Sequence, residues 1–471
     1  MILSITRHEL VMQWRHKTLK VLSPLMLVLI TLIAISHWQQ QQDFIAVQQK
    51  WQQTNEEAWQ AQPDRHPHRS SHYGAMVFRQ VSALSFLDAG VNPYVGNVLF
   101  LEAHRQNSSQ FKQYPISHSY MQMGYLSGSS LILIVWPLVL IALAYKSISG
   151  ERQQGTLRQI TSLGVSYRQI LLGKTLAYSI ISSIFLVLVF LVASLFLLQT
   201  ESGLDIVIRF GLLFMLYWFY CIIWSGMIVL ISLFSSGNNQ SLSTALLIWL
   251  LMVVVLPKLA YGVAQYLYPT PDQAVFDIQT SEAIAKVGDS HNPDDPYFKI
   301  FRDNTLLKYG VNNVEDLPIS WKGLLMQEGE RVTSEVFEQQ YTIVLEKLDK
   351  QNAWVSSWSV LSPYLIISKL SAQLSGTSYQ QVKRYEEAAE AYRYQFIQSL
   401  NDLHINEVKV KDKKEQRISK EHWSHLKGFD YQPPKLSQDL HSVLTSMGLF
   451  LLWCIGILMS LCLIRPKATS L

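Results

Sequence analysis

The sequence has little charge and very few cysteines. Only 16% of its 471 residues are charged and 49% are hydrophobic, whereas an average soluble domain carries about 25% charge. The three cysteines, Cys221, Cys454 and Cys462, all lie in apolar runs. This excludes a disulfide framework in an exported loop and a cysteine zinc site. The net charge of +4 does not indicate a nucleic-acid partner. The composition favours a membrane protein.

Recognisable catalytic motifs are also missing. Gly173-Lys174-Thr175 lacks the glycine that a phosphate loop has five residues before Gly173, because Arg168 stands there. No His-Glu-x-x-His motif occurs, and no group of nucleophile, base and orienting residue is evident. We therefore expect this chain not to be an enzyme and to bind no cofactor itself.

Long uncharged runs predict six membrane-spanning helices. A spanning helix needs about 20 mainly apolar residues. The runs place the helices near residues 21–38, 121–145, 175–198, 206–233, 241–261 and 441–464. The fourth and fifth helices share one run, and residues 234–240 in its middle have the composition of a turn.

The basic residues predict the orientation of these helices. Residues 1–20, the loop 146–174 and the tail 465–471 together hold eleven Lys and Arg but only two acidic residues. The positive-inside rule makes this side cytoplasmic, so both termini lie inside. Two long segments, 39–120 and 262–440, are then exported.

The exported segments have helical patterns. Residues 39–60 continue the first span, and residues 321–352 and 379–405 have helical spacing with few breakers. No alternating strand series is evident. The predicted fold is mainly α: a six-helix transmembrane bundle with a large, mostly helical exported domain made of two separated segments.

The loop between the second and third spans carries an ordered motif. It reads Ser149-Gly-Glu-Arg-Gln-Gln-Gly-Thr-Leu-Arg158, followed by Gly164-Val-Ser-Tyr-Arg-Gln-Ile-Leu-Leu-Gly-Lys174. It resembles the corresponding loop of ABC-2 type transporter permeases, with departures at Gln153 and Tyr167. In that family the loop forms a short coupling helix that docks on an ATPase subunit. The resemblance implies an ATPase-coupling role for Glu151, Arg152, Gly155, Thr156, Leu157, Arg158, Val165, Ser166, Gly173 and Lys174. An ordinary basic loop is the alternative. Residues 1–20 likewise resemble the interfacial helix that precedes the first span in these permeases.

Motifs in both exported segments narrow the resemblance. They are His72–Phe78, Leu87–Gly96 and Leu101–Asn107 in the first segment, and Leu361–Tyr364 and Lys369–Thr377 in the second. Together with the order of the spans, they resemble the DUF3526 group of ABC-2 permeases. The resemblance covers nearly the whole chain and implies a bacterial inner-membrane permease.

Some residues of these motifs are candidates for contact with a substrate or partner. They are His72, Tyr73, Asp88, Tyr94, Glu102, His104, Pro363 and Tyr364. The favoured interpretation is that Asp88-Ala-Gly90 and Asn92-Pro-Tyr94 are turns and that Leu99 and Leu101 pack in a core, with substrate contact as the alternative.

Histidines of the first exported segment are the candidates for a metal site. His66, His68, His72 and His104 lie within it, and histidines two to four residues apart can share a metal. Pro67 separates two of them, so the sequence does not assure a helical pair. We therefore expect surface or hydrogen-bonded histidines, with metal binding as the alternative.

The favoured hypothesis is the permease subunit of an ATP-driven exporter. The resemblance implies two copies of an ABC ATPase, which would bind ATP and Mg²⁺, and a second permease chain that is identical or related. Membrane lipid is the remaining expected partner. The alternative function is a transducer or sensor that moves the exported domain without transporting a substrate. Neither the substrate nor the direction of transport follows from the sequence.

Overall fold

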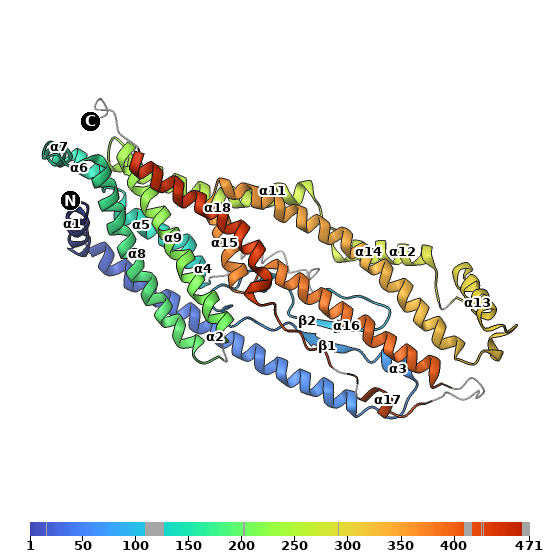
Figure 1. The fold of residues 1–471 in the computed structure, drawn as a ribbon. Helices are drawn as coiled ribbons and strands as arrows, with labels where there is room; N and C mark the ends of the chain where they lie inside the picture. Colours follow the sequence, from blue (N-terminus) through green and yellow to red (C-terminus); the bar gives the residue numbers. More distant parts are fainter. Residues whose placement is uncertain are drawn as a thin grey trace.

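The computed structural model describes residues 1–15, 17–108, 127–200, 203–290, 292–408, 417–424, 426 and 428–463. The chain is mainly helical and elongated, with a bundle of helices at one end and a long lobe at the other (Figure 1). The tail 465–471 and residues 121–126 of the predicted second span lie outside the described residues.

Six helical segments of the described chain are long and apolar enough to cross a membrane, which is the number that the uncharged runs predict. They are α2 (Lys17–Gln60), α4–η3–α5 (Gly128–Ser130, Leu131–Val135 and Trp136–Ala144), α8 (Tyr167–Leu197), α9 (Leu204–Phe234), α10–η4–α11 (Asn238–Trp249, Leu250–Val255 and Leu256–Leu267) and α18 (Leu436–Leu463). With 44 residues, α2 is about 66 Å long, whereas the hydrocarbon core of a bilayer is about 30 Å thick. The second half of α2 therefore extends into the lobe (Figure 1).

Both ends of the described chain lie at the same end of the bundle. Helix α1 (Ile2–Arg15) packs on the start of α8, where a Cβ on Gly173 would lie 2.9 Å from Ile5. The last turns of α18 pack against α9, where a Cβ on Gly226 would lie 2.5 Å from Ile457. The short helices α6 (Ser149–Gln153) and α7 (Thr156–Ser162) are also here (Figure 1). We call this the α1/α6/α7 end.

Proline accounts for the π turn in the second span. Pro137 has no backbone N–H, so it cannot bond to the carbonyl of Leu133 one turn earlier. The hydroxyl of Tyr220 donates to that carbonyl instead, at 2.8 Å. This pairing matters because lipid offers no partner to a free carbonyl. A π turn followed by a proline recurs at η4 and Pro257.

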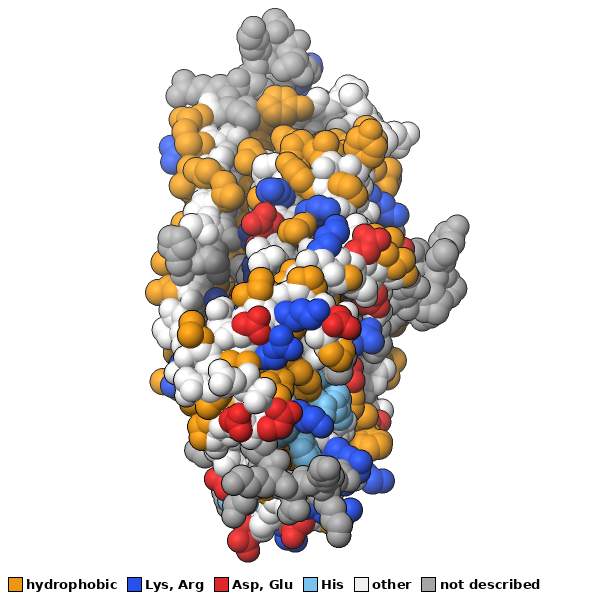
Figure 2. All heavy atoms as spheres, turned by 90° about the vertical axis from the view of Figure 1, so that its right-hand side faces the viewer, with side chains coloured by type: hydrophobic (Ala, Val, Ile, Leu, Met, Phe, Trp, Pro, Cys, Tyr) orange, Lys and Arg blue, Asp and Glu red, His pale blue; other side chains and the backbone are white. Residues whose placement is uncertain are grey.

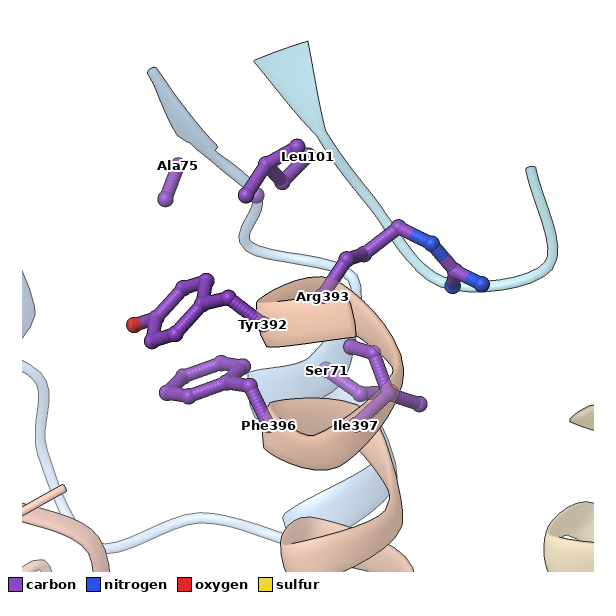
Figure 3. A pocket seen from close by; sticks show the side chains of 8 residues that line it. Ser71, Ala75, Leu101, Tyr392, Arg393, Phe396 and Ile397 are labelled. Carbon is purple, nitrogen blue, oxygen red and sulfur yellow. The ribbon is translucent and has the colours of Figure 1, made fainter. Parts of the chain in front are cut away.

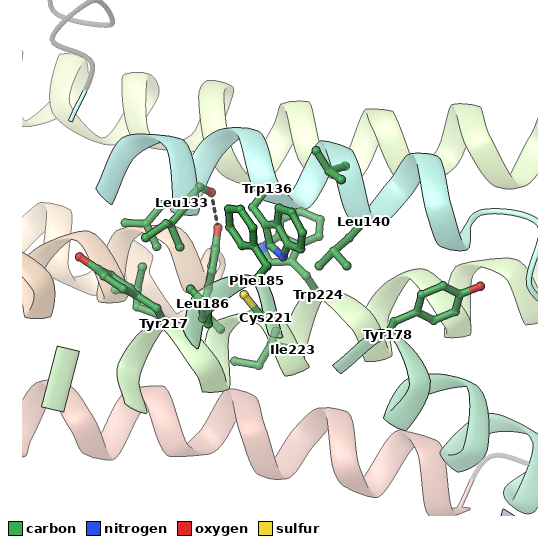
Figure 4. Packing of buried hydrophobic residues seen from close by; sticks show 14 of the residues in the cluster. Leu133, Trp136, Leu140, Tyr178, Phe185, Leu186, Tyr217, Cys221, Ile223 and Trp224 are labelled. Carbon is green, nitrogen blue, oxygen red and sulfur yellow. Dashed lines mark hydrogen bonds between the residues drawn. The ribbon is translucent and has the colours of Figure 1, made fainter. Parts of the chain in front are cut away.

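Aromatic side chains fill the core of the bundle (Figure 4). Trp136 of α5 is fully buried and stacks on Phe185 of α8, with ring centroids 3.7 Å apart. Its indole nitrogen donates to the hydroxyl of Ser182 at 3.1 Å. The ring is thus fixed by both stacking and a hydrogen bond, which holds α5 and α8 in one relative position.

The first part of the lobe contains strands that the sequence analysis did not predict. A short helix, α3 (Pro67–Ser71), precedes β1 (Ala75–Phe78), which pairs antiparallel with β2 (Val98–Leu101) in the register Ala75↔Leu101 to Phe78↔Val98. A single turn of 3₁₀-helix, η1 (Asn92–Tyr94), lies between the strands. Each strand has four residues, which are too few to display a clear alternation of apolar and polar side chains. Leu99 and Leu101 are buried, as expected.

The second part of the lobe is built on two long helices. They are α14 (Trp321–Ser357) and α16 (Tyr379–Asn406), at the positions where the sequence predicts helices. They approach closely at Gly323, where a Cβ would lie 2.8 Å from the backbone nitrogen of Ile405. The remaining elements of residues 273–424, which are not all in the lobe, are α12 (Gln273–Val287), α13 (Pro296–Tyr309), η5 (Val314–Asp316), η6 (Trp358–Val360), α15 (Pro363–Leu374) and α17 (Glu421–Ser424).

Helix α15 belongs to the bundle rather than to the lobe. The hydroxyl of Ser362 donates to the carbonyl of Met252 in η4 at 2.7 Å. The indole nitrogen of Trp453 in α18 donates to the carbonyl of Ser359 at 3.3 Å. The second exported segment of the prediction thus returns to the spans, and Ile367 of α15 is fully buried there.

The lobe differs from the bundle in surface chemistry. Figure 2 shows the face that lies on the right of Figure 1: hydrophobic side chains gather near its top, and charged and histidine side chains lie in its middle and lower parts. The lobe is therefore suited to an aqueous environment.

Candidate functional site

Two glycines shape the connection at the α1/α6/α7 end. Gly155 separates α6 from α7 with φ of +76°, and Gly164 ends α7 with φ of +82°. Both values lie in the left-handed region that glycine adopts without strain. Ser166 then caps α8, because its hydroxyl accepts from the backbone N–H of Gln169 at 3.3 Å. The chain therefore forms two short helices joined by tight turns, whereas the resemblance implied one short helix here.

A buried cluster of charges joins this connection to α1 and α8. The ammonium of Lys174 lies 2.8 Å from the carboxylate of Glu9 and 2.5 Å from that of Glu151. The Lys174 side chain is 4% exposed and that of Glu9 is 9% exposed. Tyr178 donates to Glu9 at 2.5 Å, and Gln13 donates to it at 3.2 Å. Three segments far apart in the sequence thus share one set of charges.

The charge of Glu9 depends on this cluster. Burial by itself would raise the pKa of Glu9, but the neighbouring ammonium of Lys174 and hydrogen bonds from Lys174, Tyr178 and Gln13 hold the pKa below its usual value. Glu9 is therefore ionised at neutral pH and balances Lys174.

Arg152 ties α6 to the end of α9. Its guanidinium donates to the carbonyl of Leu233 at 2.7 Å and to the carbonyl of Ser235. Ser232 adds a second link, because its hydroxyl accepts from the backbone N–H groups of Ile148 and Ser149, each at 3.0 Å. The Arg152 bonds satisfy carbonyls that the last turn of a helix leaves unpaired, and the Ser232 bonds satisfy N–H groups at the start of α6.

The residues predicted to couple to an ATPase fall into three groups by exposure. Gly155, Arg158 and Ser166 are exposed, Glu151, Arg152 and Thr156 are half-buried, and Leu157, Val165, Gly173 and Lys174 are buried. All ten residues were predicted to couple to an ATPase, but Arg152 and Lys174 pair within the chain. Exposed Leu163 and buried Glu9 and Tyr178 were not among the candidates. Glu9 is the single acidic residue of segment 1–20, and that isolation was the available signal.

Two motifs of the exported segments meet at the edge of the bundle. The carboxylate of Asp88 accepts from the backbone N–H of Gly90 at 3.0 Å and from the hydroxyl of Ser371. The backbone N–H of Val91 donates to the carbonyl of Thr377 at 2.9 Å. Burial raises the pKa of Asp88 although these hydrogen bonds oppose the shift. The Asp88 turn is therefore an internal contact between the two segments.

A second polar cluster lies inside the lobe. Arg393 of α16 is 2% exposed and lies 2.5 Å from the carboxylate of Glu330 in α14. Glu330 also lies 3.0 Å from Nδ1 of His104. Burial by itself would raise the pKa of Glu330, but His104 and the guanidinium of Arg393 lower it to about 2. Glu330 is therefore an ionised acceptor.

The candidate histidines separate into two sets. His68, His72 and His104 each offer one ring nitrogen, and these nitrogens lie within 4.8 Å of one another. His66 packs against His404 instead, with ring centroids 4.3 Å apart. The structure thus brings three of the four candidates to a place where they could hold a metal.

The other candidate contact residues do not join one site. Tyr73 and Tyr94 are exposed, and Glu102 is half-buried. The backbone carbonyl of Glu102 accepts from the guanidinium of Arg393. Pro363 is buried at the start of α15, and Tyr364 packs against the core of the bundle. Among the eight candidates for substrate or partner contact, His72 and His104 come together, and Tyr364 lies near enough to Asp88 and Tyr94 to interact with them electrostatically.

A small cavity lies between the strands and α16 (Figure 3). It is lined by Ser71, Gly74, Ala75, Leu101, Tyr392, Arg393, Phe396 and Ile397. Its volume of about 10 Å³ is enough for about one water molecule. It is therefore not a substrate site.

Comparison with known families gives matches over two parts of the chain. The family described as "ABC-2 family transporter protein" matches residues 79–254, which include the second to fourth spans and the α6–α7 connection. The family described as "Domain of unknown function (DUF3526)" matches residues 276–432, which include α12 to α17. No curated protein matches the chain. The ABC-2 family consists of membrane permeases that are generally non-catalytic and associate with an ABC ATPase. The chain is a membrane permease of the ABC-2 transporter family and belongs to its DUF3526 group.

Proposed function

We propose that this permease is the membrane subunit of an ATP-driven exporter and that the exposed face of α6 and α7 receives the motion of a separate ATPase. The observation that carries the proposal is the buried charge cluster of Lys174, Glu9 and Glu151. Through it, a displacement of α6 acts on α8 and α1 together, because separating these charges in a buried place costs about 3–5 kcal/mol.

Other contacts connect α6 to further spans. Arg152 and Ser232 connect α6 to the end of α9. The hydroxyl of Ser149 donates to the side chain of Asn238 at the start of α10, at 2.8 Å. The connection thus holds the ends of several spans at once, which is the arrangement that a coupling element needs.

The proposed docking face consists of the exposed side chains of α6 and α7. Leu163 is 80% exposed at the end of α7, and Arg158 is exposed on the same helix. An exposed leucine beside a basic residue is suited to a protein partner, because an apolar anchor with a polar rim is the usual composition of such contacts.

The setting proposed for this subunit is the bacterial inner membrane. The excess of basic residues at the α1/α6/α7 end supports a cytoplasmic position for that end and a periplasmic position for the lobe. Two ATPase subunits would bind ATP and Mg²⁺, and a second permease chain, identical or related, would complete the complex within membrane lipid.

The test uses two substitutions of equal exposure. Leu163→Asp places a charge on the proposed docking face, and Leu307→Asp makes the same change on α13 of the lobe, where the leucine is 82% exposed. The tagged chain is purified in mild detergent from its own host, and the co-purified ATPase subunit and its ATP hydrolysis are measured. We expect Leu163→Asp to lose most of the ATPase and Leu307→Asp to retain it. Equal retention by both variants would contradict this docking face.

One observation favours the alternative function as a transducer. The uninterrupted helix α2 runs from the bundle into the lobe, where its Asn55 side chain donates to the carbonyl of Met76 at 3.2 Å. A rigid helix could therefore move the lobe without any substrate crossing. The purified complex in sealed vesicles separates the two functions. ATP-dependent movement of an amphipathic fluorescent probe across the vesicle membrane supports transport. ATP-dependent motion of the lobe without any movement of the probe supports the transducer.

A further inference from the structure

We propose that His68, His72 and His104 form a binding site for a divalent transition-metal ion of the zinc class. One ring nitrogen from each residue lies within 4.8 Å of the other two. Nε2 of His68 and Nε2 of His72 are 3.2 Å apart. Two imidazole nitrogens that bind one tetrahedral zinc at 2.0–2.1 Å lie about 3.3 Å from each other. Two of the three ligands therefore already have the required spacing.

Local structure produces this pair. Pro67 occupies the first turn of α3, where its missing N–H costs nothing. His68 and His72 then stand four residues apart on one helical face. His66 has a different role, because its Nδ1 accepts from the backbone N–H of His68 at 3.3 Å and caps the helix. The proline that weakens the prediction from sequence is thus what starts the helix that pairs the ligands.

A carboxylate holds the third histidine. Nδ1 of His104 lies 3.0 Å from Glu330, and the backbone N–H of His104 donates to the same oxygen at 2.9 Å. This contact engages Nδ1, so Nε2 would be the ligand atom of His104. Metal-ligating histidines commonly have such a carboxylate on their second nitrogen. Arg393 in turn fixes Glu330.

The backbone at His104 is unusual. Its φ of +63° is the one positive value among the non-glycine residues that the structure describes. Such conformations are costly for a residue that carries a side chain, and they concentrate at ligand sites. A hydrogen bond between His68 and His72 alone would explain their contact, but it would not explain a third histidine placed on strained backbone and held by a buried carboxylate.

The donor set indicates the class of ion. Neutral imidazoles suit zinc, copper and nickel, whereas calcium and magnesium prefer oxygen ligands. Three protein ligands leave a tetrahedral ion one open position. His72 is exposed, so this position faces solvent or an outside ligand. A bound ion would connect α3 with the loop after β2 and, through Glu330, with α14.

The experiment measures zinc binding by the full chain in detergent. The protein carries an affinity tag without histidine, is stripped with a chelator, and is titrated with Zn²⁺ against a fluorescent chelator. We expect one zinc ion per chain. His72→Gln should weaken binding at least about tenfold, as loss of a ligand or its support does. His8→Gln changes an exposed histidine of α1 and should leave the affinity unchanged.

Two further readouts guard against unfolding of the variant. Zinc should raise the thermal unfolding midpoint of the unmodified chain, because it binds the folded state, whereas the same concentration of Mg²⁺ should not. X-ray absorption at the zinc edge should show nitrogen ligands at 2.0–2.1 Å. Equal affinity of the unmodified chain and His72→Gln, or the absence of a stoichiometric zinc ion in the unmodified chain, would overturn the proposal.

Discussion

Replacement of Lys174 by methionine tests the buried charge cluster most directly. Lys174→Met removes the cation that Glu9 and Glu151 share, while the methionine fills similar space. Removing one partner of a buried ion pair costs about 3–5 kcal/mol, because the other charge stays buried without compensation. The Glu9 side chain is 9% exposed, so solvent relieves little of this penalty. We expect a loss of about that size in the free energy of unfolding.

Companion variants separate the charge effect from a packing effect. Glu9→Gln leaves Lys174 paired with Glu151, so it should cost about 1–3 kcal/mol. The double variant Glu9→Gln/Lys174→Met should be more stable than Lys174→Met alone, because one uncompensated charge is gone. Lys299→Met breaks the exposed pair with Asp294 and should change stability by less than about 1 kcal/mol.

The assay is unfolding of the purified chain in mixed micelles, followed by tryptophan fluorescence and repeated across pH. The folded-state pKa of Glu9 lies below its ordinary value of 4.5. The stability from its pairing with Lys174 is thus fully present above about pH 4.5 and is lost as the pH falls below it. Tyr178 and Gln13 also contact Glu9, and Glu151 contacts Lys174. Glu9→Gln should have a shallower acid limb. The reasoning is refuted if Lys174→Met has the same free energy of unfolding as the unmodified chain. It is also refuted if the double variant is no more stable than Lys174→Met alone.

Two further predictions concern the contacts that set the fold. Gly90→Ala should destabilise the protein more than Gly164→Ala: both glycines have positive φ, but a Cβ on Gly90 would lie 2.3 Å from the carbonyl of Thr377, whereas one on Gly164 meets nothing within 4 Å. Thermal unfolding midpoints of the two variants measure the difference, and equal midpoints would contradict the contact. Tyr220→Phe should cost about 1–3 kcal/mol, because it leaves the carbonyl of Leu133 without its hydrogen bond in an apolar place. Unfolding in mixed micelles measures this, and no loss of stability would show that the bond contributes nothing.

The candidate site could be predicted only in part. The resemblance of the motif around Glu151 implied one short helix, and the structure has two, separated by the tight turn that was expected at Gly155. The partner of Lys174 could not be predicted, because Glu9 lies 165 residues away and nothing in the intervening chain specifies the contact. The same limitation applies to Glu330, which meets His104 from a distance of 226 residues.

The sequence by itself determined that this is a mainly α membrane protein with six spans, and it located the long helices. Hydrophobic length, the positions of basic residues and helical periodicity are properties of neighbouring residues, so they can be read without a fold. The tertiary structure alone decided that α15 returns to the bundle, that the Asp88 turn meets Thr377, and that three histidines converge. These outcomes depend on how distant segments pack, and the free energy of packing belongs to the pair of surfaces rather than to either segment.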